Sequence, residues 1–266
     1  MFSVLPDELR RAIDAARERL GGFADLRYAE TVTSTNDIAA QLAWSGAANG
    51  AAVLAGQQTA GRGRRGRVWS SPTGAGLYLS VVLRGPSLSA APGLMTLGAG
   101  VAAVDAVKAA TGLPVMLKWP NDLVIGDTWK KLGGILCEAQ GPDAIVVGLG
   151  INVTPAAHPP DVMARATSIE GELGRAVDRA ALVIECLVQL RAAADTVRSN
   201  QAAALLDRWR ARAAAGWQAA AVRWQDGDRE ARGVARDVDV DGALLVERDG
   251  RRERVIAGEV VWERHP

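Results

Sequence analysis

Apolar residues recur at strand and helix spacings along most of the chain. Leu77, Leu79, Val81 and Leu83 occupy every second position, which predicts a strand over 77–83 with one buried face. Shorter apolar runs predict strands over residues 51–57, 115–118, 123–125, 133–138 and 144–147. Helical spacing predicts helices over residues 7–20, 34–44, 92–111, 179–198 and 202–215, with an irregular segment over 162–172.

Two of these helices carry start signals. Asp7 is the expected N-cap of the first helix, because its carboxylate can accept hydrogen bonds from unpaired amides. Ser34 is followed three residues later by Asp37, which resembles a capping box.

The sequence changes character after Gly216. Residues 219–262 predict four or five short strands, separated by turn signals such as Asp241-Gly242 and Asp249-Gly250. Asp-Gly favours tight hairpin turns because glycine tolerates positive φ. We therefore predict an α+β protein, with a mixed-sheet domain over residues 1–216 and a small β-barrel over residues 217–266.

Composition limits location and partners. The 266 residues are 48% hydrophobic and 23% charged, with a net charge of +1, so no broad nucleic-acid-binding surface is expected. Two distant cysteines indicate a reducing compartment, and the N-terminus becomes charged too early for a signal peptide. The longest uncharged stretch, 85–104, is interrupted by proline, glycine and serine. We expect a cytoplasmic protein without a membrane span.

Histidine offers little chemistry here. His158 and His265 are the only histidines, and each stands beside a proline outside any motif. Both are expected at the surface, and Cys137 has no histidine partner in the sequence. We therefore expect no protein-held metal centre and no histidine-based nucleophile.

The densest charge lies in GRGRRGRVW, residues 61–69. Its glycines fit the dinucleotide pattern G-x-G-x-x-G and, with Val68, the glycine-rich loop of protein kinases. The first pattern requires a following helix and a later acidic residue, whereas a Ser-Pro-Thr-Gly turn follows and Pro86 stands at the acidic position. The second requires V-A-I-K, H-R-D and D-F-G, which the chain lacks. Neither pattern fits.

Four arginines in six residues give this loop its own chemistry. Like charges repel, so the loop should be mobile until an anion neutralises it. Guanidinium groups pair with phosphate oxygens in a bidentate manner, and glycines allow close backbone approach. These properties predict an anion-ordered lid, although a solvated basic turn is the alternative for the loop taken alone.

Four further polar segments lie at or beside the ends of predicted elements. They are S-T-N at 34–36, K-W-P-N-D at 118–122, K-K-L-G-G-I-L at 130–136 and G-L-G-I-N at 148–152. Each has a structural explanation by itself: a helix cap at Ser34, a core position for Trp119, a bulge at Gly148 and Gly150. Their occurrence together with the loop favours one binding site.

Together these motifs resemble those of the biotin protein ligases. That family carries, in this order, S-T-N, G-R-G-R-x-G-R, K-W-P-N-D, K-L-x-G-I and G-x-G-x-N, and all five occur here between Tyr28 and Asn152. The resemblance implies a catalytic domain of the biotin/lipoate ligase type and a C-terminal SH3-like barrel. It also implies that biotin and ATP, with Mg²⁺, form biotinyl-5′-AMP, and that biotin then passes to a lysine of a biotin carboxyl carrier protein.

The resemblance also implies roles for individual residues. Biotin would be bound by Ser34, Thr35, Asn36, Gln58, Arg62, Gly63, Arg64 and Lys131. ATP or the adenylate would be bound by Arg64, Arg67, Trp69, Lys118, Asn121 and Asn152. The catalytic residues would be Lys131, Arg62, Arg64 and Asp122, with Asp122 as an orienter or base for the carrier lysine.

Three alternatives differ from this interpretation. A ligase for another acyl cofactor such as lipoate is disfavoured, because such enzymes lack the arginine-glycine loop and K-W-P-N-D. A biotin-responsive transcriptional regulator would need a DNA-binding domain, and only 27 residues precede Tyr28. A binding protein without catalysis is disfavoured by the presence of Arg62, Arg64 and Lys131. We expect a carrier protein rather than DNA as the partner, and a monomer or a weak ligand-dependent dimer.

Overall fold

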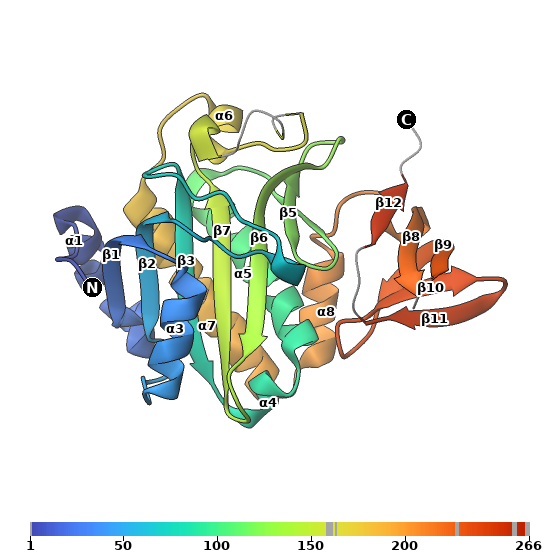
Figure 1. The fold of residues 1–266 in the computed structure, drawn as a ribbon, viewed down its shortest axis with the longest axis horizontal. Coiled ribbons are helices and arrows are strands. Elements are labelled where there is room, and N and C mark those ends of the chain that lie inside the picture. The colour runs from blue at the N-terminus through green and yellow to red at the C-terminus, as the bar shows by residue number, and fades with distance from the viewer. Residues whose placement is uncertain (1, 158–161, 163, 227–228, 257–259, 264–266) are drawn as a thin grey trace.

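The computed structural model describes residues 2–157, 162, 164–226, 229–256 and 260–263 (Figure 1). His158 and His265 lie outside these residues. The larger sheet has the strand order β1-β2-β3-β7-β6-β5-β4, in which only β1 and β2 run parallel. Its strands are β1 (Leu26–Val32), β2 (Ala52–Gln58), β3 (Gly76–Arg84), β4 (Met116–Lys118), β5 (Asp122–Ile125), β6 (Lys130–Ala139) and β7 (Ala144–Asn152).

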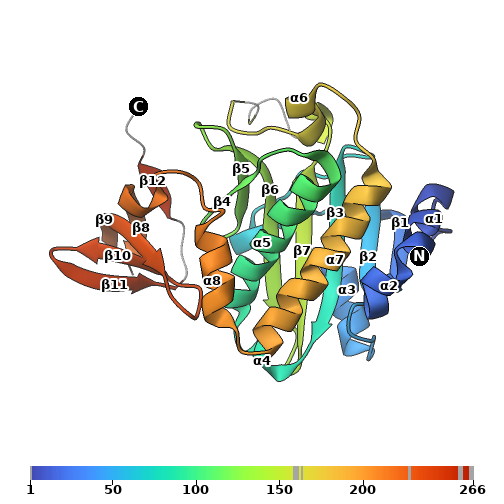
Figure 2. The same cartoon turned by 180° about the vertical axis from the view of Figure 1, so that it is seen from behind.

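Helices lie on both faces of this sheet. One face carries α3 (Thr35–Trp44), and the other carries α5 (Pro92–Thr111), α7 (Arg179–Arg198) and α8 (Ala202–Arg210) (Figures 1 and 2). The shorter helices are α1 (Asp7–Ala15), α2 (Arg17–Leu20), α4 (Pro86–Ser89) and α6 (Ile169–Leu173). The 3₁₀ turns are η1 (Gly21–Ala24), η2 (Arg64–Gly66), η3 (Pro155–Ala157) and η5 (Trp217–Ala219).

The central strands are buried on both faces. In β2, Leu54 belongs to the larger core beneath α5 and α7, whereas Val53 and Ala55 belong to the smaller core beneath α3. A strand covered on both sides reads as a continuous apolar run, because successive side chains point to opposite faces. This explains why the apolar run at 51–57 lacks alternation.

Helix α5 is a core helix. By length and composition it could cross a membrane, but 67% of the relevant window is buried inside the protein. Its small residues permit close approach: a Cβ atom at Gly100 would lie 3.0 Å from a Leu117 methyl group, and one at Gly98 would lie 3.1 Å from Leu205. Packing against the sheet and α8 therefore explains its apolar composition.

The C-terminal strands form a second, antiparallel sheet of order β11-β10-β9-β8-β12. Its strands are β8 (Ala221–Asp226), β9 (Arg229–Val238), β10 (Leu244–Arg248), β11 (Arg251–Val255) and β12 (Val261–Glu263). Asp249 and Gly250 have φ of 50° and 72°, as the hairpin between β10 and β11 requires. The predicted mixed sheet and small barrel-like domain are confirmed, and the exact boundary at 216/217 stays a prediction.

Several local predictions differ from the structure. The segment 162–172, expected to be irregular, contains the start of helix α6 at Ile169. The helix expected over 7–20 breaks at Ala16, and Asp7 is the first helical residue, preceded by Pro6 at the N-cap, with no side-chain cap. Strand β1 was missed because it is an edge strand in which only three of seven residues are buried. The helix expected over 202–215 ends at Arg210, because Leu117 of β4 hydrogen-bonds the backbone on either side of Ala213.

Candidate functional site

Two glycines of β7 make room for side chains of other motifs. A Cβ atom at Gly148 would lie 2.0 Å from Asn36 Oδ1, and one at Gly150 would lie 2.6 Å from Trp69 Nε1. The two positions point to the same face, the one that carries α3. The motifs S-T-N, G-R-G-R and G-x-G-x-N therefore meet on that face, and glycine is needed because larger residues would displace Asn36 or Trp69.

The start of α3 forms a buried polar cluster. Thr35 N and Oγ1 both lie near Gln58 Oε1, at 2.8 and 3.1 Å. Ser80 Oγ lies 2.8 Å from Thr35 Oγ1 and 2.7 Å from Asn36 Oδ1. Ser34 occupies the N-cap position as expected, but its buried side chain makes no capping hydrogen bond. The cluster is thus connected by side chains from α3, β2 and β3.

Asn36 is tied to the arginine loop through Glu138 of β6. Asn36 Nδ2 donates to Glu138 Oε2 at 2.9 Å, and Arg62 Nη2 donates to Glu138 Oε1 at 2.5 Å. Arg62 also pairs with Asp37 at 2.6 Å. Burial alone would lower the pKa of Arg62, but the hydrogen bond to Asp37 and the charge of Glu138 outweigh it and raise that pKa. Arg62 therefore already has two counter-ions.

The arginine loop is a tight hairpin. Trp69 N donates to Gly61 O at 2.8 Å, and Gly63 N donates to Arg67 O at 2.7 Å. At its tip, Arg65 and Gly66 have φ of 58° and 73°. Positive φ at two successive residues is the geometry of a type I′ hairpin turn, which explains the last glycine of the motif. Gly61 packs closely against the other arm of this hairpin, because a Cβ atom at Gly61 would lie 2.3 Å from Trp69 O.

Lys131 lies between a carboxylate and an aromatic ring. Its Nζ is 2.6 Å from Asp122 Oδ1 and 5.5 Å from the centre of the Trp69 ring. A bulge in the β5–β6 ladder lies beside this position, because Val124 pairs with Lys131 whereas Leu123 pairs with Gly133. Bulges often redirect side chains beside functional sites. A Cβ atom at Gly134 would lie 3.7 Å from Lys131 Nζ, so this cation stands over bare strand backbone.

Two groups at this site have incomplete pairing. Arg64 has no ion pair among the described residues, and its Nη1 donates a long hydrogen bond of 3.4 Å to Asn121 Oδ1. Burial lowers the pKa of Arg64, and the charge of Asp122 partly opposes this. The buried Trp69 Nε1 likewise finds no hydrogen-bond partner in the described part of the chain. A half-buried cation and an unused donor are the features that an anionic ligand would satisfy.

Other predicted residues support the backbone around this face. Asn152 Nδ2 donates to Thr167 O at 2.9 Å, and Lys131 pairs with the same segment through backbone hydrogen bonds. Asn121 Nδ2 donates to Ile135 O at 2.8 Å. Lys118 lies opposite Asp122 in the β4–β5 ladder. Their predicted contacts with a nucleotide stay predictions.

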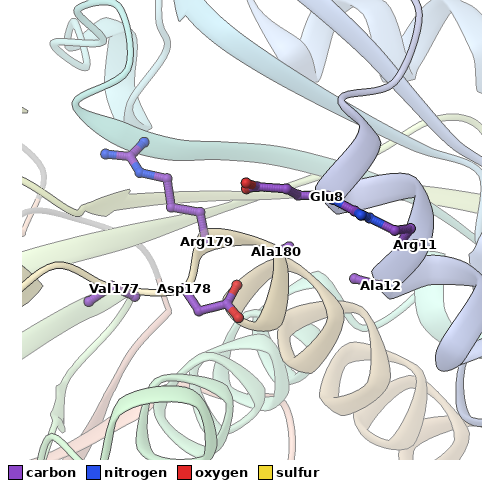
Figure 3. Close-up of a pocket in the computed structure, with 7 residues that line it drawn as sticks. All are labelled: Glu8, Arg11, Ala12, Val177, Asp178, Arg179 and Ala180. Atoms are coloured by element: carbon purple, nitrogen blue, oxygen red, sulfur yellow. The ribbon is translucent and has the colours of Figure 1, made fainter.

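Two surface hollows lie away from this face. Figure 3 shows Glu8 and Arg11 of α1 beside Asp178 and Arg179 at the start of α7, around a hollow of about 440 Å³. A neighbouring apolar cleft of about 240 Å³ is lined by Leu54 and other residues below α7. Neither is lined by a residue of the five motifs. We therefore assign the site by its chemistry, on the α3 face, where the polar cluster and the cations meet.

Comparison with known proteins agrees with this geometry. Residues 28–152 match the biotin/lipoate A/B protein ligase family, and residues 221–262 match the biotin protein ligase C terminal domain. The biotin–[acetyl-CoA-carboxylase] ligase of Mycobacterium tuberculosis is 35% identical over 266 residues, which cover 96% of this chain and 97% of that protein. The chain belongs to the biotin protein ligase family.

Other biotin protein ligases agree in structure or sequence. The biotin protein ligase of Aquifex aeolicus, solved with biotin and ATP, superposes with a TM-score of 0.78 at 26% identity, covering 91% of this chain and 99% of that one. The bifunctional ligase/repressor BirA of Salmonella typhimurium is 37% identical over 216 residues, 80% of this chain. The match covers 66% of that relative, so the chain spans slightly less than two thirds of its length.

Two residues of this candidate site were missed by sequence reasoning. Glu138 lies three residues beyond K-L-x-G-I, and Ser80 lies in a strand that reads as plain core. The signal for Ser80 is a polar residue within the apolar alternation of β3, where complete burial requires a hydrogen-bond partner. For Glu138 the only signal in the sequence is a charged residue at the end of the predicted apolar strand 133–138.

Proposed function

We propose that this chain is a biotin protein ligase that activates biotin as biotinyl-5′-AMP at the expense of ATP. The biotinyl group would then pass to a lysine of a biotin carboxyl carrier protein. The observation that supports this best is the meeting, over the glycines of β6 and β7, of a buried polar cluster with Arg64 and Lys131. The family supplies the substrates, and these residues supply suitable chemistry for them.

The polar cluster suits the urea ring of biotin. A buried urea has donors and an acceptor, and each one left unpaired costs ~1–3 kcal/mol. Ser34, Thr35 and Gln58 line this cluster at the start of α3 and the end of β2. Gly148 and Gly150 are neighbours on one face of β7, roughly 7 Å apart by strand geometry. An extended ligand could therefore run from Asn36 towards Lys131 along the strand.

In the first step, a carboxylate oxygen of biotin would attack the α-phosphorus of ATP, and the bond to pyrophosphate would break. Two anions must approach each other, so fixed positive charge is the main requirement. Lys131 and Arg64 would provide it, with Asp122 holding Lys131 in place. Arg62 could contribute only after leaving Asp37 and Glu138, so we assign it first to holding the loop against α3.

Mg²⁺ bound to the nucleotide would neutralise further phosphate charge. Mg²⁺ usually takes phosphate oxygens, waters and one or two carboxylates rather than a protein cage. This fits the described residues, in which no three His, Cys, Asp or Glu side chains come together as a metal-binding group. In the second step, the deprotonated carrier lysine would attack the acyl carbon and expel AMP. The arginine loop, which ends at Trp69, would exclude water until then.

The test is a coupled assay with biotin, MgATP and a biotin carboxyl carrier domain. We expect biotin-dependent release of pyrophosphate and a mass gain of one biotinyl group on one carrier lysine. Pyrophosphate release with lipoate but not with biotin would instead assign the chain to another acyl cofactor. Binding of biotin without pyrophosphate release would contradict the proposed activity.

A further inference from the structure

Lys131 shares a face with Gly134 because strand β6 carries one extra residue between them. Side chains alternate between the two faces of a strand, so residues three apart normally point to opposite faces. The β5–β6 ladder shifts register beside Val124, which pairs with Lys131, so Leu132 is left without a partner across the hairpin. This bulge reverses the alternation, and Lys131 Nζ therefore reaches Asp122 at 2.6 Å, above the backbone of Gly134.

The turn between β5 and β6 has to be short for this bulge to form. It covers residues 126–129 and is closed by a hydrogen bond from Trp129 N to Gly126 O at 3.1 Å. In a ladder without the bulge, Val124 would pair with Leu132, and the turn would contain one more residue. The register of a hairpin follows from the type and length of its turn. The short turn therefore selects the register that places the amine of β6 beside the carboxylate of β5.

Trp129 closes the turn in an unfavourable conformation. Its φ is 52°, which glycine adopts readily but a tryptophan rarely does. Gly126, Asp127 and Thr128 are exposed, whereas Trp129 is 9% exposed, with its ring edge-on to Trp262 of β12 at 5.7 Å and 70°. Edge-to-face aromatic pairs stabilise beyond the area that they bury, and a strained φ persists only where the surroundings compensate for it. The contact with the C-terminal sheet thus stabilises the end of the turn.

We propose that Trp262 is a positioning residue for Lys131, and that it acts through Trp129 by favouring the short turn and its bulge. The C-terminal sheet thus influences adenylate formation through the β5–β6 hairpin. The segment after β7 also holds this strand, since Lys131 N donates to Arg165 O at 2.8 Å and Lys131 O accepts from Thr167 N at 2.9 Å. Loss of Trp262 should therefore displace the amine in part of the population and leave the fold intact. The proposal rests on the proposed function, because that function assigns Lys131 to the reaction.

Amide hydrogen exchange tests the hold on the turn without any substrate. In Trp262→Ala, exchange over residues 126–132 should accelerate on the order of 10-fold, while exchange over residues 144–152 of β7 should keep the wild-type rate. Val261→Ala is the matched control, because Val261 is the preceding residue of β12 and is 42% exposed, so it should exchange like the wild type. Unchanged exchange over 126–132 in Trp262→Ala, or equal acceleration in both segments, would overturn the inference.

Kinetics then test the link to Lys131. In Trp262→Ala, biotin-dependent pyrophosphate release should slow several-fold, with a smaller change in the biotin dissociation constant, whereas Val261→Ala should match the wild type. Faster exchange in Trp262→Ala without slower pyrophosphate release would overturn the role of the turn. Wild-type protein that releases no pyrophosphate with biotin would instead refute the proposed function, and the exchange rates would still show whether Trp262 holds the turn.

Two variants of Trp129 separate backbone conformation from packing. Both Trp129→Ala and Trp129→Gly remove the ring, but glycine accepts a positive φ, so pyrophosphate release should be faster in Trp129→Gly than in Trp129→Ala. An equal or lower rate in Trp129→Gly would show that the conformation of the turn does not control Lys131, and would overturn the inference. This pair also decides the question if Trp262→Ala does not fold.

Discussion

The indole Nε1 of Trp119 donates a hydrogen bond to the carbonyl oxygen of Gly242, 3.0 Å away and 123 positions later in the chain. Trp119 belongs to K-W-P-N-D and is buried, and Gly242 lies in the turn between β9 and β10. The same turn also packs closely against α5, because a Cβ atom at Gly242 would lie 2.6 Å from the backbone of Gly93. The segment that carries Asn121 and Asp122 is therefore anchored to the C-terminal sheet.

Replacing Trp119 by phenylalanine should destabilise the protein. The substitution leaves the carbonyl of Gly242 without its donor and creates a gap at the junction, so we expect a loss of ~1–3 kcal/mol in the free energy of unfolding, measured by urea titration. Trp44→Phe is the matched control, because Trp44 is 71% exposed. If Trp44→Phe lowered the free energy of unfolding as much as Trp119→Phe, the contact between Trp119 and Gly242 would not be the cause of the loss.

Lys131→Ala should slow adenylate formation much more than it weakens biotin binding. The charge of Lys131 is needed chiefly when two anions approach, so we expect the rate of pyrophosphate release to fall ~100-fold or more, with a much smaller change in the biotin dissociation constant. Lys130→Ala, one residue earlier and exposed, is the control. Equal losses in rate and affinity would show that Lys131 acts in binding alone.

Arg64→Ala should let the adenylate escape. Arg64 is half-buried and has no carboxylate partner among the described residues. Its loss should therefore shorten the half-life of bound biotinyl-5′-AMP about tenfold, which corresponds to roughly 1.4 kcal/mol. A chase of preformed adenylate measures this. Arg65→Asn removes one charge from the exposed hairpin tip and tolerates its positive φ, so it should keep the wild-type half-life.

Two glycine substitutions should separate ligand contact from protein packing. At Gly134 a new methyl group makes only ordinary contacts within the protein, so Gly134→Ala should keep the melting temperature but weaken biotin binding. At Gly148 the methyl group would overlap Asn36, so Gly148→Ala should lower both the melting temperature and the affinity for biotin. Calorimetry for binding and unfolding distinguishes them, and unchanged biotin binding in Gly134→Ala would place the ligand elsewhere.

Stability should decline at alkaline pH. Burial raises the pKa of the Cys186 thiol to about 12, so the folded protein keeps this proton where the unfolded chain loses it. The unfolded state is therefore favoured increasingly as the pH rises from about 9 to about 12, by at most ~1.4 kcal/mol per pH unit for one group. Urea unfolding of Cys186→Ala should show a shallower decline. An identical pH dependence would show that other groups, such as Tyr78, dominate.

The sequence predicted those elements whose cause is local. Helix α5 and strand β3 follow from continuous spacing of apolar residues, and the hairpin at Asp249 follows from its turn residues. Strand β1 was not predicted, because its pattern depends on which face of an edge strand the α-helices cover. The end of α8 was not predicted either, because pairing with Leu117 overrides the helix preference of the alanines that follow.

The site was predictable in its members but not in their pairing. Short motifs identify Lys131 and Arg62, yet nothing in the spacing shows that Lys131 pairs with Asp122 or that Arg62 pairs with Glu138. Such contacts depend on strand order, in which β6 lies between β7 and β5. The motifs gave Arg62 and Arg64 the same roles, whereas the fold gives Arg62 two carboxylate partners and gives Arg64 no ion pair among the described residues.

The glycines under the site limit how its selectivity can be redesigned. Glycine has no side chain to shorten, so substitutions at 134, 148 and 150 can only reduce the room available. Enzymes intended to accept bulkier vitamin analogues will have to gain space from the walls, by trimming Trp69 or residues of α3. Libraries that randomise the three glycine positions should yield almost entirely inactive members.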